Sequence, residues 1–175
     1  MGQYFRFYLS NGIEEKVLNP YSYNTLAKLT EHSYVGNTFC NAAVSVLVQL
    51  GPSVVYHLGD YADEDPDFDK DIFRTVWGDD NGYTEFHPAN VINSGQIFIK
   101  NDAKKQYIRY VFSRPPEGTD YLNTFALLTA FRNTDGGSYH GRNEHLVGTW
   151  AGDVLEATEE EPEGYRKIHG WVFKE

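Results

Sequence analysis

The stretch TFCNAAVSVLVQL, residues 38–50, decides which fold the rest of the chain can build. Its polar residues, with the residue just before it, recur every four positions and form one stripe: Asn37, Asn41, Ser45 and Gln49. A period of four is typical of an α-helix, although three valines lower the intrinsic helix propensity of this run. Asn37 or Thr38 can cap the start of the helix, and Gly51 with Pro52 ends it. We therefore predict that residues 38–50 form the core helix.

The segments on both sides of this helix have the patterns of strands. In residues 4–9, YFRFYL, the apolar Phe5, Phe7 and Leu9 share one face of a half-buried strand. Further strands are predicted at residues 13–18, 53–58, 96–100, 106–112, 123–131, 146–157 and 165–173. The run at 123–131 is apolar on both faces, which indicates a strand in the centre of the sheet.

Two further helices are predicted outside the core stretch. Residues 22–32 are expected to form a short helix with Leu26 and Leu29 directed inward. A longer one follows the acidic run, with Asp65 as its N-cap and Gly78 as its C-terminal stop.

Together these elements predict an α+β fold. It comprises a largely antiparallel sheet of about seven strands with two to three helices. No linker divides the sequence, and 175 residues are enough to bury a substantial core, so residues 1–175 are expected to form a single domain.

The charge balance limits the classes of partner. The chain carries 25 acidic and 15 basic residues, for a formal net charge of −10. This charge repels phosphate backbones and anionic membrane surfaces, so neither direct nucleic-acid binding nor membrane association is expected. The acidic balance is explained by solubility, by a basic protein partner or by mimicry of a nucleic acid.

The single cysteine and the absence of long apolar runs indicate a cytoplasmic protein. Cys40 has no second cysteine to pair with, so a reducing compartment fits. The N-terminus lacks the apolar block of a signal peptide, and no apolar run reaches membrane-spanning length.

Residues 124–163 combine apolar strands, a glycine-rich loop and polar side chains, and they contain most of the catalytic candidates. Asp135 and His140 lie in the loop, and Asp153 follows it. Asp60 ends an earlier strand in the triplet Gly-Asp-Tyr. His140 could act as a base or a metal ligand, with the three carboxylates orienting it or holding a cation, as in a small hydrolase or a metal-dependent enzyme.

Two other patterns bear on metals and cofactors. Asp63, Asp65 and Asp67 alternate as in a calcium loop, but Phe68 and Arg74 occupy the positions where an EF-hand needs glycine and glutamate. An irregular Ca²⁺ or Mg²⁺ site therefore competes with a simpler explanation, the acidic start of a helix.

The sequence contains no nucleophile elbow, Walker loop or dinucleotide fingerprint, and no cofactor is expected.

Tyrosine and arginine recur on strand faces and predict a surface for a planar ligand such as a nucleotide. Ordinary amphipathic strands explain the same pattern. The candidate ligand-contacting residues are Tyr4, Arg6, Tyr8, Tyr107 and Arg109, with Tyr139 and Trp150 from the glycine-rich stretch.

Four short motifs resemble a group of uncharacterised proteins from bacteria and phage-like genomes. They are MGQYF at 1–5, GDY at 59–61, GGSYHG at 136–141 and VGTWAGD at 147–153. The resemblance implies a small accessory or phage-associated protein and carries no activity with it.

Three hypotheses follow from these observations. The first is a non-enzymatic, acidic binding protein that recognises a protein, with a basic surface as its natural complement, or a small ligand. One concrete form of it is a phage-associated inhibitor of a host or defence component. The second is the small hydrolase or metal-dependent enzyme, and the third is sequestration of a nucleotide-like ligand by the tyrosine and arginine faces.

Overall fold

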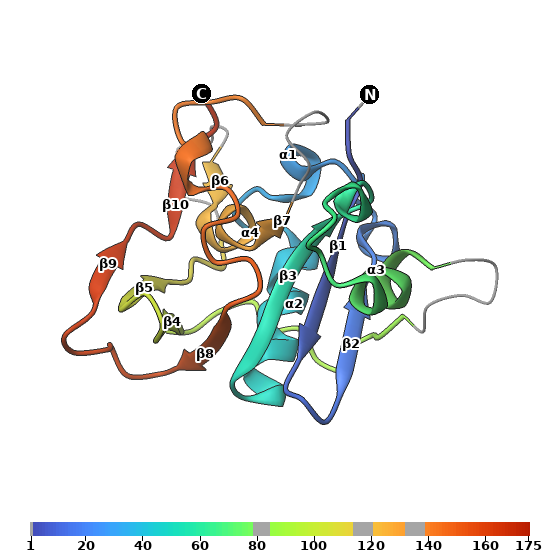
Figure 1. Ribbon diagram of the computed structural model, residues 1–175. Coiled ribbons are helices and arrows are strands. Elements are labelled where there is room, and N and C mark those ends of the chain that lie inside the picture. Colours follow the sequence, from blue (N-terminus) through green and yellow to red (C-terminus); the bar gives the residue numbers. More distant parts are fainter. Residues whose placement is uncertain (1, 79–84, 114–120, 132–138) are drawn as a thin grey trace.

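The core helix forms where the sequence predicts it. The computed structural model describes residues 2–78, 85–113, 121–131 and 139–175 (Figure 1). Helix α2 spans Thr38–Leu50, and the side chain of its N-cap Asn37 accepts a hydrogen bond from the backbone N–H of Phe39 at 2.8 Å. Gly51 ends the helix with φ +76°, a left-handed value that favours glycine.

A mostly antiparallel sheet of eight strands contains most of the remaining regular structure. Its strands are β1 (Phe5–Ser10), β2 (Glu15–Leu18), β3 (Ser53–Gly59), β4 (Phe98–Asn101), β5 (Gln106–Arg109), β7 (Ala130–Phe131), β8 (Val154–Thr158) and β9 (Arg166–Ile168). The order is β2-β1-β3-β8-β4-β5-β9, and β7 pairs with β3. The β3–β7 and β5–β9 pairs are parallel and the others are antiparallel. These helices and strands confirm the α+β prediction.

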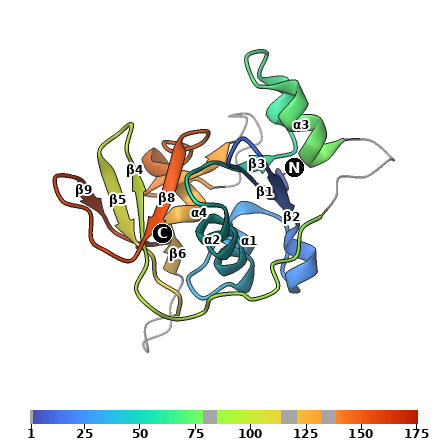
Figure 2. The ribbon, with the colours of Figure 1, turned by 90° about the horizontal axis from the view of Figure 1, so that it is seen from below.

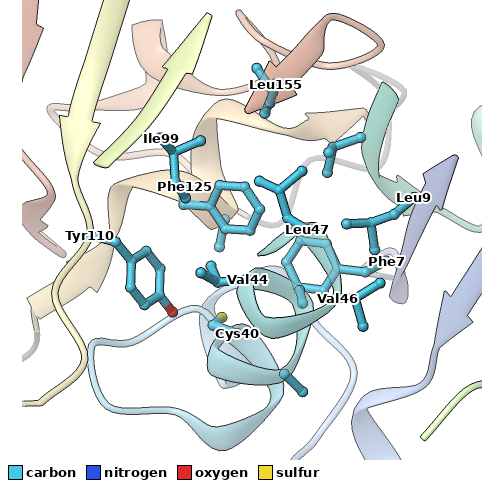
Figure 3. Close-up of a cluster of buried hydrophobic side chains, with 14 of the residues drawn as sticks. Phe7, Leu9, Cys40, Val44, Val46, Leu47, Ile99, Tyr110, Phe125 and Leu155 are labelled. Carbon is cyan, nitrogen blue, oxygen red and sulfur yellow. The ribbon is translucent and has the colours of Figure 1, made fainter. Parts of the chain in front are cut away.

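Two helices cover opposite faces of the sheet. The residues of α2 from Phe39 to Leu47 are buried and pack against β1, β3 and β8, and Figure 3 shows Leu47, Val46 and Val44 among the side chains of that core. Helix α3, Lys70–Trp77, lies against the other face of β1 and β3, where Val76 packs with Tyr8 and Leu58 (Figure 1). β1 is therefore covered on both faces.

A second, two-stranded sheet lies beside the first. It pairs β6 (Tyr121–Asn123) with β10 (Trp171–Phe173) in antiparallel fashion. The smaller helical elements are α1 (Leu29–His32), α4 (Thr124–Leu128), η1 (Pro20–Tyr23), η2 (Ala62–Glu64) and η4 (Glu144–Leu146). Among the residues that the structure describes, no helix is long and apolar enough to cross a bilayer.

The predicted strand at 123–131 is wrong, because most of it is helix α4. The side chain of Asn123 accepts a hydrogen bond from the backbone N–H of Phe125 at 3.0 Å and caps the helix. All five residues of α4 are buried, so its sequence lacks a polar stripe. A short apolar run of this kind has the same pattern in a buried helix and in a buried strand.

The two outer helices also differ from the prediction. Within 22–32 only the single turn α1 is α-helical; Leu29 is buried as expected, but Leu26 is 61% exposed. Helix α3 starts after Asp69, whose side chain accepts hydrogen bonds from two backbone N–H groups. Asp65 instead caps the turn before it by accepting from the backbone N–H of Asp67 at 2.9 Å.

Candidate binding site

The three catalytic candidates that the structure describes, Asp60, His140 and Asp153, each lie in a different local setting. Asp60 follows the last residue of β3, and its carboxylate accepts a hydrogen bond from the backbone N–H of Tyr4 at 3.0 Å. Asp153 lies near the start of the same strand, because its carbonyl accepts from the backbone N–H of Val55. The five residue-to-residue steps from Val55 to Asp60 correspond to about 16 Å of extended chain.

Asp153 and His140 each have a local partner. The carboxylate of Asp153 accepts hydrogen bonds from Asn101 and Lys104, which tie it to the β4–β5 turn. His140 is exposed, and its Nδ1 lies 3.3 Å from the carboxylate of Glu144. Asp135 lies outside the described residues.

Burial raises the pKa of the Asp60 carboxyl above its ordinary value. The hydrogen bond from the Tyr4 N–H and the positive charge of Arg6 lower the pKa, but by less than burial raises it. A raised carboxyl pKa is common in catalytic acids, but a catalytic acid also needs a reacting group within hydrogen-bond reach. Here the carboxylate is engaged with the backbone at the start of β1. It therefore has the position of a structural cap.

Most of the tyrosine and arginine side chains proposed to contact a ligand are buried or engaged in contacts within the protein. Arg6 and Tyr8 lie on the face of β1 that α3 covers, and Tyr8 is 3% exposed. The hydroxyl of Tyr107 donates to Glu161 at 2.6 Å. β1 and β5 are separated by three strands in the sheet, so their side chains do not share a surface. Tyr4 and Arg109 are the exposed members of the set.

Tyr139 and Trp150 belong to the core. Trp150 is fully buried, and its indole N–H donates to the side-chain oxygen of Gln106 at 2.8 Å. Tyr139 is 4% exposed and packs in the cluster that contains Phe5 and Leu122.

The acidic run does not gather metal ligands in the described part of the chain. Asp63 and Asp67 are exposed, and Asp65 is engaged in the turn with Asp67. No group of three histidine, cysteine or carboxylate side chains is positioned to hold a metal ion in residues 2–78, 85–113, 121–131 and 139–175.

An open groove forms where β5, β9 and β10 meet, and we call it the Arg109–Trp171 groove. Its main cavity has a volume of about 440 Å³. The lining residues are Asn93, Ser94, Gly95, Arg109, Tyr110, Val111, Phe112, Ser113, Lys167, His169, Gly170 and Trp171. A smaller cavity of about 290 Å³ shares His169 and Trp171 with it and adds Arg142, Asn143, Val172, Phe173 and Glu175. Figure 1 shows β5, β9 and β10 on the same side of the molecule.

Side chains alternate between the two faces of β5 and β9, and the charged side chains of the groove lie on the outer face. Ile108 and Ile168 are paired across the parallel β5–β9 ladder and face the core. Because side chains alternate along a strand, Arg109, Lys167 and His169 lie on the opposite side. All three of these residues are exposed.

Gly170 allows β9 and β10 to pass close to β5. A Cβ atom at this position would lie 2.0 Å from the carbonyl oxygen of Arg109. The Gly170 carbonyl accepts a hydrogen bond from the backbone N–H of Thr124 at 3.1 Å, which joins it to the start of α4. The predicted continuous strand at 165–173 is therefore divided, and the division places Trp171 beside Arg109 in the groove wall.

Aromatic rings form the other wall of the groove. Trp171 contacts Tyr121 edge to face, with ring centroids 4.6 Å apart, and Phe173 edge to face at 5.3 Å. Tyr121 and Phe173 are also in contact, at 5.0 Å. This mutual packing fixes the Trp171 ring, which is only partly buried.

The sign of charge in the groove is opposite to that of the whole chain. Arg109, Lys167 and Arg142 carry positive charge, whereas Glu175 is the acidic residue of the two linings. Lys167 also lies 3.7 Å from Glu161, outside the lining. A hollow lined by one sign of charge concentrates counter-ions of the other sign.

Tyr110 closes the floor of the groove as a neutral phenol. Burial raises its pKa well above the ordinary value, and its hydroxyl donates to the side-chain oxygen of Asn41 at 2.9 Å. The groove floor is thereby joined to the core helix α2.

The sequence contained a signal for this groove. Lys167, His169 and Trp171 alternate in the run KIHGW, so they share one face of an extended chain. Arg109 was identified from its neighbouring tyrosines, but nothing in the sequence pairs it with residues sixty positions later. No protein-family model, curated protein or solved structure matches the chain.

Proposed function

We propose that this protein is a non-enzymatic binding protein whose Arg109–Trp171 groove takes a small ligand with an anionic group and a flat apolar part, such as a nucleotide. One observation carries the proposal. Arg109, Lys167 and the partly exposed Trp171 ring line one hollow in a chain with a net charge of −10. Positive charge concentrated in this way favours an anion.

The two halves of the ligand match two parts of the groove. The planar guanidinium of Arg109 suits bidentate hydrogen bonding to a phosphate or carboxylate, and the ammonium of Lys167 adds a second positive charge. The Trp171 ring offers a face or edge for stacking a planar group. A cavity of about 440 Å³ lies within the range of small-molecule sites, about 300–1,000 Å³.

A small anion fits this protein better than a long polyanion. The whole chain repels an extended phosphate backbone, because acidic residues outnumber basic ones by 25 to 15. A mononucleotide brings few negative charges and contacts only the groove, where the local charge is positive. Its binding should weaken as salt screens the partly exposed charges.

The intrinsic fluorescence of Trp171 allows a direct test. Trp150 is fully buried and Trp77 lies under Arg6, so a ligand in the groove should chiefly affect Trp171. We would titrate the protein with adenosine monophosphate, and separately with adenosine and with inorganic phosphate. Arg109→Gln should weaken mononucleotide binding about tenfold or more, because a charge-assisted hydrogen bond contributes about 1.5–3 kcal/mol.

Arg166→Gln is the matched control. Arg166 precedes Lys167 in β9 and is exposed, but it does not line the groove. The Arg166→Gln substitution removes one positive charge, as Arg109→Gln does, but it leaves the lining of the groove intact. Equal loss of affinity in both variants, or no fluorescence change at millimolar mononucleotide, would contradict the proposal.

A second candidate function rests on the acidic surface around α3. The exposed carboxylates there are Asp63, Glu64, Asp67, Asp69 and Asp71. Figure 2 shows α3 standing away from the body of the molecule, where a partner can reach it. This surface suits a basic protein, and it is the region through which an inhibitor of a host or defence component would act. Charge reversal at Asp63 and Asp67 should abolish capture of such a partner, whereas reversal at the distant Glu160 should not.

A further inference from the structure

Two histidines contact each other inside the core of the protein. His32 ends α1 and His57 lies in β3, and both are fully buried. Their Nε2 atoms are 2.7 Å apart, a normal hydrogen-bond distance. One proton must therefore lie between the two nitrogen atoms.

The other nitrogen of each ring also needs a proton. Nδ1 of His32 lies 2.8 Å from the carbonyl oxygen of Leu26, and Nδ1 of His57 lies 3.0 Å from that of Ala126. A carbonyl oxygen only accepts, so each Nδ1 must donate. The three hydrogen bonds of the pair require three protons, but two neutral imidazole rings carry only two.

A metal ion does not explain the contact. An ion bound between two imidazole nitrogens needs about 2.0 Å to each, or about 4 Å between them when the three atoms are in line. The observed 2.7 Å is too short for this arrangement but suits a shared proton.

The surroundings of the pair are aromatic and uncharged. The Phe7 ring of β1 stacks on His57 at a centroid distance of 4.1 Å, and Phe39 of α2 meets the His32 ring edge to face at 5.0 Å. The face of an aromatic ring attracts a cation. From α4 the pair receives only the Ala126 carbonyl.

Among the described residues, Cys40 contacts His32 and Glu31 precedes it in α1, and both side chains are engaged elsewhere. The thiol of Cys40, on α2, donates to the backbone carbonyl of His32 at 3.2 Å, and burial raises its pKa, so it stays neutral. The carboxylate of Glu31, on α1, accepts from the backbone N–H of Lys28. Within the described part of the chain, the causes of the pKa shifts of the pair are burial, the two backbone carbonyls and, for His57, the neighbouring His32.

We infer that His32 and His57 form a single proton-binding site, in which one added proton completes all three hydrogen bonds: each Nδ1 then carries a proton and the two Nε2 atoms share the third. In the neutral pair one ring must give up its hydrogen bond to a carbonyl. Ala126 is fully buried in α4, whereas Leu26 is 61% exposed, so we place the missing bond at the Leu26 carbonyl, which water can reach in its place. Acid therefore tightens the attachment of the Leu26 segment to β3. A second added proton would place two positive charges 2.7 Å apart, and the pair rejects it.

The direction of the titration follows from burial. Burial lowers the pKa of both histidines below the ordinary value of about 6.5. The site therefore fills below that pH, and it takes up one proton where two separate histidines would take up two.

Imidazole ¹⁵N NMR spectra test this inference when they are recorded from about pH 8 down to about pH 3, because burial lowers the pKa of His32 to about 4. We expect the resonances of both rings to change together in one step that corresponds to one proton, and both Nδ1 atoms to be protonated at its end. His140→Gln, at an exposed position, should leave the step unchanged. Addition of a chelator should also leave it unchanged.

His32→Gln is the informative variant. A glutamine amide can donate to Nε2 of His57 without any added proton, so the one-proton step should disappear while the fold is kept. If this variant does not fold, the wild-type spectra alone decide. Independent titration of the two rings, uptake of two protons, or a chelator-sensitive spectrum would each overturn the inference.

Discussion

The guanidinium of Arg6 lies over the ring of Trp77, 4.1 Å from its centroid, and its Nη1 donates to the carbonyl oxygen of Val76 at 2.8 Å. This contact attaches the end of α3 to the outer face of β1. Helix α3 has eight residues, too few to be stable by itself. Arg6 thus acts as an anchor for the helix.

Replacing Arg6 by alanine should therefore lower the stability of the fold. The loss of the cation–π contact and of a charged hydrogen bond predicts a decrease of roughly 1–3 kcal/mol in the free energy of unfolding. Urea denaturation measures it. Arg74→Ala is the control, since Arg74 is exposed and makes a long contact of 3.4 Å with Asp71. The control should change stability by less than about 0.5 kcal/mol, and equal effects would contradict the anchoring role.

Gly170→Ala should damage both stability and the groove. Its Cβ would meet the main-chain oxygen of Arg109 at 2.0 Å, so the backbones must separate. We expect a loss of about 1–3 kcal/mol, as for overpacked sites, and weaker mononucleotide binding.

Gly164→Ala separates these two effects. Gly164 has φ +78° but no atom near the added Cβ, so alanine there brings only backbone strain, about 1–2 kcal/mol. It should lower stability without changing affinity. A Gly170→Ala protein with wild-type affinity would show that close approach of the strands does not shape the groove.

Asn123→Ala should destabilise α4 by removing its cap. The side chain of Asn123 satisfies the N–H of Phe125, and loss of such a cap costs about 1 kcal/mol. Thermal unfolding followed by circular dichroism measures the change. Asn123→Ser retains a side-chain acceptor and should recover part of the loss, whereas a serine variant as unstable as the alanine variant would contradict the capping role.

Asp60→Asn should be tolerated or slightly stabilising at neutral pH. The pKa of Asp60 is raised by burial, so its charge opposes folding above that pKa and stability increases as pH falls through it. Asparagine keeps an acceptor for the Tyr4 N–H without the charge. The variant lacks this gain, so the difference in unfolding free energy between the two proteins should shift in favour of wild type as the pH falls through the pKa of Asp60. Stability that falls more steeply toward acid in wild type than in Asp60→Asn would contradict the assigned direction.

Local patterns in the sequence predicted those elements that have one polar and one apolar side. Helix α2 has a polar stripe and a defined start and end, and it forms over the predicted residues. β1 is also found where its alternation indicates, at Phe5–Ser10. Helix α4 lacks a polar side because every residue in it is buried, so no periodicity could distinguish it from a strand.

The site could be predicted only in fragments. Alternation placed Arg109 on an outward face, and it also places Lys167, His169 and Trp171 on one face. Their meeting depends on the parallel pairing of β5 with β9, which joins residues about sixty positions apart. The buried pair of His32 and His57 depends in the same way on contacts between distant segments.

The order of strands also bears on self-association. The eight-stranded sheet ends at β2 and β9, and an open edge offers unpaired backbone groups to another chain. At β9 the exposed Arg166 and Lys167 would bring like charges together if two copies met there. At β2 the backbone of Val17 is already engaged by Glu85 and Phe86. Charge at one edge and cover at the other therefore protect the folded chain against aggregation by strand addition.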